Sequence, residues 1–308
     1  MPDRLARATL AALPAAVRRP RYDLDAVATG IVHFGPGAFF RAHIASYIDD
    51  LLEHDPRWGA AGVALRSGAL AEDLAAQDNL YTLAELGTPT RYRVLGALQE
   101  YQTGTADGAR VRALFARPEV RLVTMTVTEK GYCLDADGRL DLSHPDIAHD
   151  RGRPPSPRSV AGWIVEGLSS RYAIGGLPPI VMSCDNLASN GEKLRALVIA
   201  LAQAQGRDEL ARWIAGEVRF PSTMVDSIAP ATDEALRVRV AEALDLMDTI
   251  PVQREPFRQW VVSDNLGLEA PDLTSVGVAL TRDVHAYEQA KLRLLNGAHS
   301  ALAYLGLL

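Results

Sequence analysis

The sequence predicts an α/β fold, with a Rossmann-like, doubly wound, mostly parallel sheet followed by the start of an all-helical second domain. Three observations support this fold. Short β-rich runs alternate with longer segments of helical periodicity through most of the chain. A glycine turn, GPG, follows the first of these runs directly. From about residue 280 the pattern is continuously helical, so we place a domain boundary there, between a Rossmann-like domain at 1–280 and an opening helix at 281–308.

The individual elements follow from composition and periodicity. Strands are expected where apolar and β-branched residues gather in short runs, at 30–34, 59–65, 91–98, 120–128 and 178–186. Helices are expected where apolar residues recur every three or four positions, at 41–55, 156–173 and 191–205. Segment 216–232 has two prolines around a short apolar stretch, which indicates a strand and a loop rather than a helix.

Composition excludes several classes of protein. The net charge is -6 and no basic block is interleaved with aromatic residues, so we expect no nucleic-acid partner. No run of eighteen apolar residues occurs and the N-terminus lacks the apolar core of a signal peptide. We therefore expect a cytoplasmic protein with no membrane partner. Cys133 and Cys184 lie far apart in the chain, which favours two buried free thiols over a disulfide.

The glycine turn indicates a dinucleotide site. Gly35 and Gly37 lie between a predicted strand and a predicted helix, where backbone N–H groups, here of Gly37 and Ala38, can approach a pyrophosphate. Phe40 occupies the place of the third glycine, and an unrelated tight turn explains a partial motif about equally well. Arg41 either adds a positive charge near the phosphates or is solvated.

The corner after the second predicted strand bears on which cofactor binds. An NAD site usually has an acidic residue there to bind the ribose hydroxyls. This chain has Arg66 and Ser67, and its acids, Glu72 and Asp73, come later. An arginine in this corner can accept a 2′-phosphate, so we expect NAD with NADP as the alternative.

Polar residues gather where predicted strands end, which is the edge of a parallel sheet at which ligands bind. Three clusters fall there: Thr128, Glu129 and Lys130; Asp185, Asn186 and Asn190; and Asp226. Each cluster alone is typical of a turn or a helix cap. Together at one edge they predict a binding site.

The last predicted helix carries three polar residues in one sector, namely Lys291, Asn296 and His299. A lone histidine is more often structural than functional. The lysine differs, because a leucine-rich setting partly desolvates its ammonium and lets it act as a base. Glu288 could pair with it or relay its proton. No HExxH or CxxC motif is present, so we expect no metal and a metal-free base.

Six blocks of the chain, in order and spacing, resemble the polyol-specific long-chain dehydrogenases, a family that includes mannitol 2-dehydrogenase and fructuronate reductase (mannonate oxidoreductase). The blocks are 31–43, 122–133, 181–191, 220–232, 255–265 and 291–306. Residues 65–82 look more like the sugar-acid branch of this family. The resemblance implies metal-independent, NAD(P)-dependent hydride transfer at C2 of a linear sugar acid or polyol, with fructuronate and mannonate favoured over mannitol and fructose.

The resemblance also implies roles for individual residues. Lys291 matches the family's catalytic lysine, Asn186 and Asn296 match the asparagines that hold the oxyanion, and His299 matches a histidine that binds substrate. The expected substrate contacts are Asp226 and Lys130. The expected cofactor contacts are Phe34, Gly35, Gly37, Ala38, Phe39, Arg66, Thr128 and Glu129.

Two departures from the family pattern matter. Phe40 stands where the family commonly has histidine. The resemblance also implies a helical second domain, of which we expect this chain to contain only the opening helix. We expect that helix, if isolated, to expose its leucine face and to favour self-association. A catalytically impaired dinucleotide-binding module with a sensing or assembly role is the alternative function.

Overall fold

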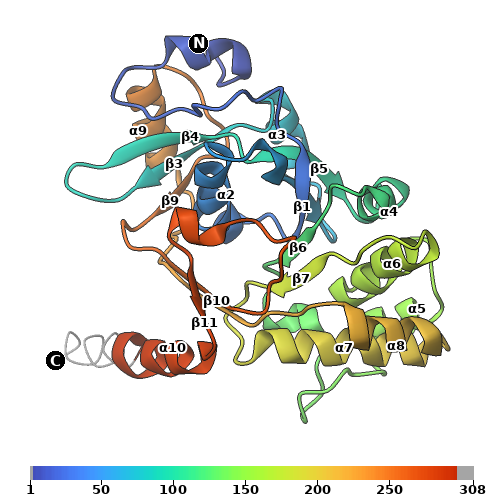
Figure 1. The fold of residues 1–308 in the computed structure, drawn as a ribbon. Helices are drawn as coiled ribbons and strands as arrows, with labels where there is room; N and C mark the ends of the chain where they lie inside the picture. The colour runs from blue at the N-terminus through green and yellow to red at the C-terminus, as the bar shows by residue number, and fades with distance from the viewer. Residues whose placement is uncertain (1–2, 297–308) are drawn as a thin grey trace.

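The computed structural model describes residues 3–296, and it contains the predicted parallel sheet at its centre (Figure 1). Five strands lie in the order β5-β2-β1-β6-β7, and every neighbouring pair is parallel. Their bounds are β1 Thr29–Phe34, β2 Gly59–Ala64, β5 Leu98–Thr103, β6 Leu122–Met125 and β7 Ile180–Ser183. The chain runs outward from β1 on one side and then continues from β6 on the other. The gap between β1 and β6 is thus the switch point where ligands bind in such sheets.

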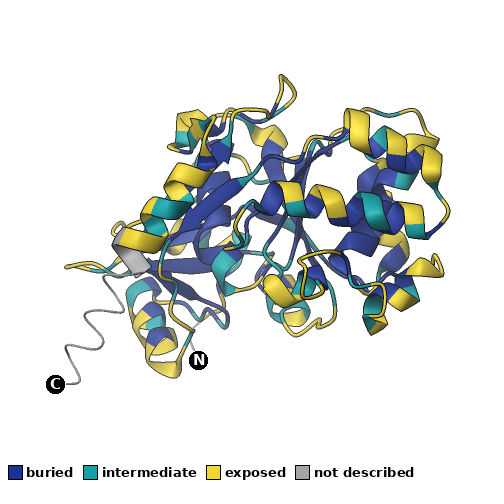
Figure 2. Cartoon of the chain, turned by 90° about the horizontal axis from the view of Figure 1, so that it is seen from below, coloured by how far each residue is buried: buried dark blue, intermediate teal, exposed yellow. Residues whose placement is uncertain are grey.

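Helices cover both faces of this sheet. The α-helices of the described residues are α1 Ala38–Ala42, α2 Ile44–Leu52, α3 Ala71–Ala76, α4 Gly108–Ala116, α5 Pro145–Arg151, α6 Val160–Ala173, α7 Asn190–Ala204, α8 Asp208–Glu217, α9 Glu234–Leu244 and α10 Val284–Ala290, of which α9 and α10 pack on the small sheets described next. All six residues of β1 are buried, because alternate side chains enter two different cores. Val32 and Phe34 pack with α4, α6, α7 and α8, whereas Ile31 packs with α2. Figure 2 shows the resulting dark-blue strands between helices whose outer faces are yellow.

Two small sheets lie beside the main one. One has the order β4-β3-β9, with β3 Tyr81–Glu85, β4 Arg91–Leu95 and β9 Val252–Arg254. The other has the order β11-β10-β8, with β8 Thr223–Asp226, β10 Gln259–Ser263 and β11 Ala279–Thr281. Short 3-10 turns are η1 Arg7–Ala12, η2 Pro56–Trp58, η3 Glu129–Tyr132 and η4 Leu273–Val276. The second small sheet supplies Asp226, at the end of β8.

The prediction of one strand over 91–98 was wrong. The chain turns at Gly96, so β4 ends in a small sheet and β5 begins at the edge of the main sheet. The reason is the buried carboxylate of Asp49 on α2, whose Oδ1 accepts the Gly96 N–H at 2.8 Å. The same carboxylate accepts Arg93 Nη2 at 2.5 Å and the hydroxyl of Tyr22 at 2.5 Å. The buried Asp49–Arg93 ion pair therefore fixes the turn between β4 of the small sheet and β5 of the main sheet.

The helix predicted at 281–308 changes its geometry within the described residues. The helix α10 ends at Ala290 and continues as a π-helix, η5 Lys291–Asn296. A π-helix holds more residues per turn, so the angular sector predicted for Lys291 and Asn296 does not apply. The predicted His299 lies outside the described residues. The helix α10 packs against β8 and β10, and the boundary near 280 stays a prediction.

Within residues 3–296, none of the helices is long and apolar enough to cross a bilayer.

Candidate functional site

The glycine turn after β1 uses its two glycines for different reasons. Gly35 has φ +82, and a Cβ there would lie 2.3 Å from the carbonyl oxygen of Thr126. Its N–H donates to the Val63 carbonyl at 2.9 Å, which ties the turn to β2. A Cβ on Gly37 would meet only the Gly35 oxygen, at 3.9 Å. Gly35 is therefore required by the backbone, whereas Gly37 keeps the space above the turn open.

Phe40 fills the place of the third glycine as part of the core. Its ring stacks on His33 of β1, with the ring centroids 3.7 Å apart. The two ring nitrogens of His33 lie 2.7 Å from the Thr124 hydroxyl and 3.0 Å from the Thr126 hydroxyl. Burial lowers the pKa of His33 to about 3, so the imidazole is neutral. An uncharged hydrogen-bonded group of His33, Thr124 and Thr126 thus lies next to the glycine turn.

Arg41 takes neither of the two positions that the sequence left open. Its side chain is buried, its Nη1 donates to the Ile250 carbonyl at 2.6 Å, and its guanidinium lies over the Tyr81 ring. The guanidinium therefore joins α1 to the first small sheet instead of facing phosphate or solvent. Desolvation lowers the pKa of Arg41, and the nearby Tyr81 and Asp248 oppose this shift.

Two adjoining cavities lie at the carboxyl ends of β1 and β6. The first has a volume of about 700 Å³ and includes Arg66 and Ser67 in its wall. The second has a volume of about 560 Å³ and includes Asn186 and Lys291. The walls that both cavities share are Gly35, Gly37, Thr126 and Thr128. A continuous cleft therefore crosses the sheet at its switch point.

Asp185, directly after β7, fixes the loop that both cavities share. Its carboxylate accepts the N–H groups of Val127 at 3.1 Å and Thr128 at 2.9 Å, and the Tyr132 hydroxyl at 2.7 Å. Thr128 has φ 66, a conformation that is unusual for a β-branched residue and is often found at functional sites. Burial raises the pKa of Asp185, and the three donors oppose that shift. The sequence placed Asp185 at a strand end but gave no sign of this anchoring role.

Lys291 lies in the wall of the second cavity. Its Nζ donates to the Val225 carbonyl at 2.6 Å and to Asn186 Oδ1 at 3.3 Å. It also forms an ion pair with Asp226 Oδ1 at 3.3 Å, and both side chains are nearly buried, at 13% and 11% exposure. The structure therefore brings together three predicted residues, from the ends of β7 and β8 and from the π-helix. Glu288 pairs elsewhere, accepting the Ser189 N–H at 3.1 Å.

The remaining predicted residues divide between the two cavities and the core. Ala38, Phe39 and Glu129 line the second cavity. Lys130 lines the first cavity and not the second, so it does not join the group around Lys291. The side chain of Phe34 is fully buried against Phe115, because its position on β1 faces the core and not the cleft. For Asn296 the structure describes only the backbone.

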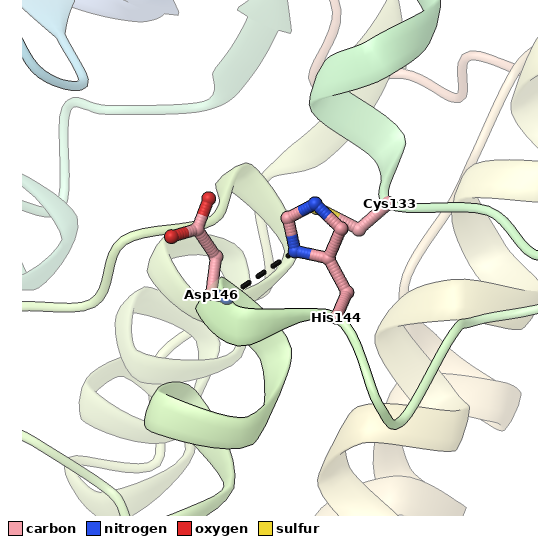
Figure 3. A group of neighbouring side chains, drawn as sticks. All are labelled: Cys133, His144 and Asp146. Atoms are coloured by element: carbon pink, nitrogen blue, oxygen red, sulfur yellow. Dashed lines mark hydrogen bonds between the residues drawn. The ribbon is translucent and has the colours of Figure 1, made fainter.

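Cys133, His144 and Asp146 form a cluster in the wall of the first cavity (Figure 3). Their potential ligand atoms all lie within 4.8 Å of one another. Each group has other contacts: His144 Nδ1 accepts the Asp146 N–H at 3.2 Å, and the Asp146 carboxylate forms an ion pair with Arg66. Burial raises the pKa of Cys133 to about 11, so it is a neutral thiol. These contacts hold the three side chains in the wall of the first cavity.

A five-stranded parallel sheet with a glycine turn and a cleft at its switch point defines this chain as a Rossmann-type α/β protein. The chain belongs to the mannitol dehydrogenase family, because the family described as "Mannitol dehydrogenase Rossmann domain" matches residues 29–275. This confirms the family that the sequence blocks indicated.

Named relatives agree with this assignment. The chain is 44% identical over 293 residues to mannitol 2-dehydrogenase of Cereibacter sphaeroides, covering 94% of this chain and 61% of that one. It is 44% identical over 299 residues to D-mannonate oxidoreductase of Escherichia coli (strain K12), covering 95% and 61%. The solved ternary complex of Pseudomonas fluorescens mannitol 2-dehydrogenase with NAD and D-mannitol superposes with a TM-score of 0.92 at 41% identity, covering 99% and 63%. The chain thus spans about three fifths of the length of these relatives.

Proposed function

We propose that this chain carries the cofactor site and the proton-transfer group of an NAD(P)-dependent oxidoreductase that transfers hydride at C2 of a linear sugar acid or polyol. The favoured substrates are of the fructuronate and mannonate type, with mannitol and fructose next. Chemistry at C2 needs no metal in this proposal, because Lys291 transfers the proton. The observation that carries the proposal is the convergence of Lys291, Asn186 and Asp226 beside the glycine turn.

The residues of the cleft fit a dinucleotide. Gly37 leaves open the space that a side chain would fill, and the cleft continues on both sides of this turn. Arg66 and Ser67 would hold the adenosine ribose, and Ala38, Phe39 and Glu129 would face the nicotinamide half. When bound, the nicotinamide would supply the acceptor or donor of hydride. NAD is the proposed cofactor, with NADP as the alternative.

Lys291 would handle the proton at Nζ. In alcohol oxidation the hydroxyl proton passes to neutral Lys291 as the C2–H bond breaks and the carbonyl forms, and in ketone reduction the ammonium returns that proton. Nζ already donates to Val225 O and Asn186 Oδ1, and it forms an ion pair with Asp226 Oδ1. The substrate oxygen must therefore replace one of the two contacts at 3.3 Å.

Asn186 would stabilise the charge that develops on the substrate oxygen. Its Oδ1 faces Lys291 at 3.3 Å, so its Nδ2 is the group left to donate toward substrate. A fixed neutral donor of this kind stabilises an oxyanion without reorganising during the reaction. Asp226 would accept a second substrate hydroxyl, and Asn296 and His299 keep their proposed roles in binding the oxyanion and the substrate.

The test is turnover, followed by the near-ultraviolet absorbance of reduced nicotinamide with fructuronate, tagaturonate, mannitol and fructose, and with both cofactors. Lys291→Met is expected to lower kcat by about 10²- to 10⁴-fold while the Kd for NADH changes by less than about threefold. The matched control is Lys193→Met on α7, which is expected to leave both unchanged.

Equal kcat in Lys291→Met and the unaltered chain would refute the role of Lys291 as the general base. Cofactor binding without turnover on any of the substrates would instead favour the dinucleotide-binding module with a sensing or assembly role. The cytoplasmic location and the self-association through the last helix stay predictions.

A further inference from the structure

The first cavity contains a carboxylate that comes from a distant part of the chain. No acidic residue stands directly after β2, where Arg66 and Ser67 form the corner. Among the described residues that line this cavity, Asp146 is the one carboxylate, and Arg66, Lys130 and Arg158 are the cations. Asp146 belongs to α5, and its Oδ2 forms an ion pair with Arg66 Nη2 across 80 positions of sequence. The carboxylate beside Arg66 therefore comes from α5 and not from the residues directly after β2.

Asp146 is the fixed partner of this pair and Arg66 is the exposed one. The Asp146 side chain is 14% exposed, compared with 74% for Arg66. The Asp146 N–H donates to the His144 ring at 3.2 Å, which holds the backbone at the cavity wall. Figure 3 shows this bond going to the backbone of Asp146, which leaves the carboxylate for Arg66. A ligand that binds here therefore contacts an Asp146 carboxylate whose position is fixed and an Arg66 guanidinium that is free to reorient.

We propose that Asp146 sets the choice between NAD and NADP. This inference rests on the proposed function, since it concerns the ribose end of the same cofactor cleft. The residue after β2 lies at the adenosine ribose in such folds. There the Asp146 carboxylate neutralises Arg66 and accepts a hydrogen bond from a free 2′-hydroxyl. It repels a 2′-phosphate, because two like charges would come together while the Arg66 guanidinium is already paired with Asp146.

The test measures the Kd of NADH and of NADPH by nicotinamide fluorescence for the full chain and its variants. Asp146→Asn removes the charge but not the shape, and it is expected to tighten NADPH binding by about tenfold or more. NADH binding is expected to weaken by up to about tenfold, because an amide oxygen accepts from the 2′-hydroxyl less strongly than a carboxylate does. Adding Arg66→Ala to Asp146→Asn is expected to cancel the gain, since the released guanidinium is the group that binds the phosphate.

The matched control is Asp137→Asn, which removes the same unit of charge at an exposed residue outside the cavity and is expected to shift neither Kd. NADPH binding that does not tighten in Asp146→Asn, in a protein that still binds NADH, overturns the role of Asp146 and leaves the proposed function in place. If NADPH still binds more tightly in the double variant, Arg66 is not the group that binds the 2′-phosphate. An unaltered chain that binds neither nucleotide overturns both this inference and the proposed function.

Discussion

Lowering the pH is expected to destabilise the folded protein through two buried histidines. His33 and His43 are both almost fully buried, and desolvation lowers the pKa of each from 6.5 to about 3. Between these two values the unfolded chain binds protons that the folded chain does not. Their contribution to stability is therefore present above about pH 6.5 and is lost as the pH falls toward 3. Each group changes the free energy of unfolding by about 1.4 kcal/mol per pH unit in this window.

His33 can be isolated from the other titrating groups. Between about pH 7 and about pH 5 one such histidine contributes about 2 kcal/mol. Urea unfolding at several pH values gives the free energy of unfolding for the unaltered chain and for His33→Gln, which has no titrating group. The variant is expected to lose less stability over this interval, by about 2 kcal/mol. The carboxyl groups act in both proteins, so they do not enter the difference.

The control is Phe40→Leu, which removes the ring stacked on His33 but no titrating group. It is expected to lower stability at every pH and to keep the pH dependence of the unaltered chain. Parallel curves for His33→Gln and the unaltered chain would refute the reasoning, because His33 would then bind a proton equally well in the folded and unfolded states.

Two further predictions concern the glycine turn, which the proposed function places at the cofactor, and the buried ion pair. Gly37→Ala is expected to weaken NADH binding by about tenfold with little change in urea stability, whereas Gly35→Ala, with φ +82 and a contact at 2.3 Å, should destabilise the fold. Equal unfolding midpoints for the two variants would contradict this division. Asp49→Ala is expected to lower the free energy of unfolding by about 3–5 kcal/mol, because it breaks a buried ion pair with Arg93, which keeps only Asp50, and removes the acceptor of the Tyr22 hydroxyl and the Gly96 N–H. Asp25→Ala, in an exposed pair, should change it little, and similar losses in the two variants would show that burial is not the cause.

The main sheet and the glycine turn could be predicted from local sequence. The first strand is apolar on both faces because both faces are covered, and its turn needs glycine at Gly35 for a positive φ. Asn186 follows β7 of the main sheet, as the strand-end pattern predicted. Asp226 instead ends β8 in a separate small sheet, so the prediction that it lies at the same sheet edge was wrong and its contact with Lys291 depends on how the two sheets pack.

Other features depend on contacts that no local pattern records. The break of 91–98 into two strands depends on Asp49, 47 positions before Gly96. Asp146 comes from a stretch without clear periodicity, and only the folded chain brings it to Arg66. The π-helix at Lys291 likewise differs from an α-helix by hydrogen bonding and not by residue type.

The two parts of the cleft are synthesised at different times, because their residues lie far apart along the chain. All five strands of the main sheet, and the loop anchored by Asp185, precede residue 186, whereas Lys291 contacts Asn186 across 105 positions. Contacts of such long range have the largest loop-closure entropy, so they form late in folding and open early in local unfolding. A nascent chain emerging from the ribosome can therefore form the main sheet and its glycine turn before Lys291 has been translated.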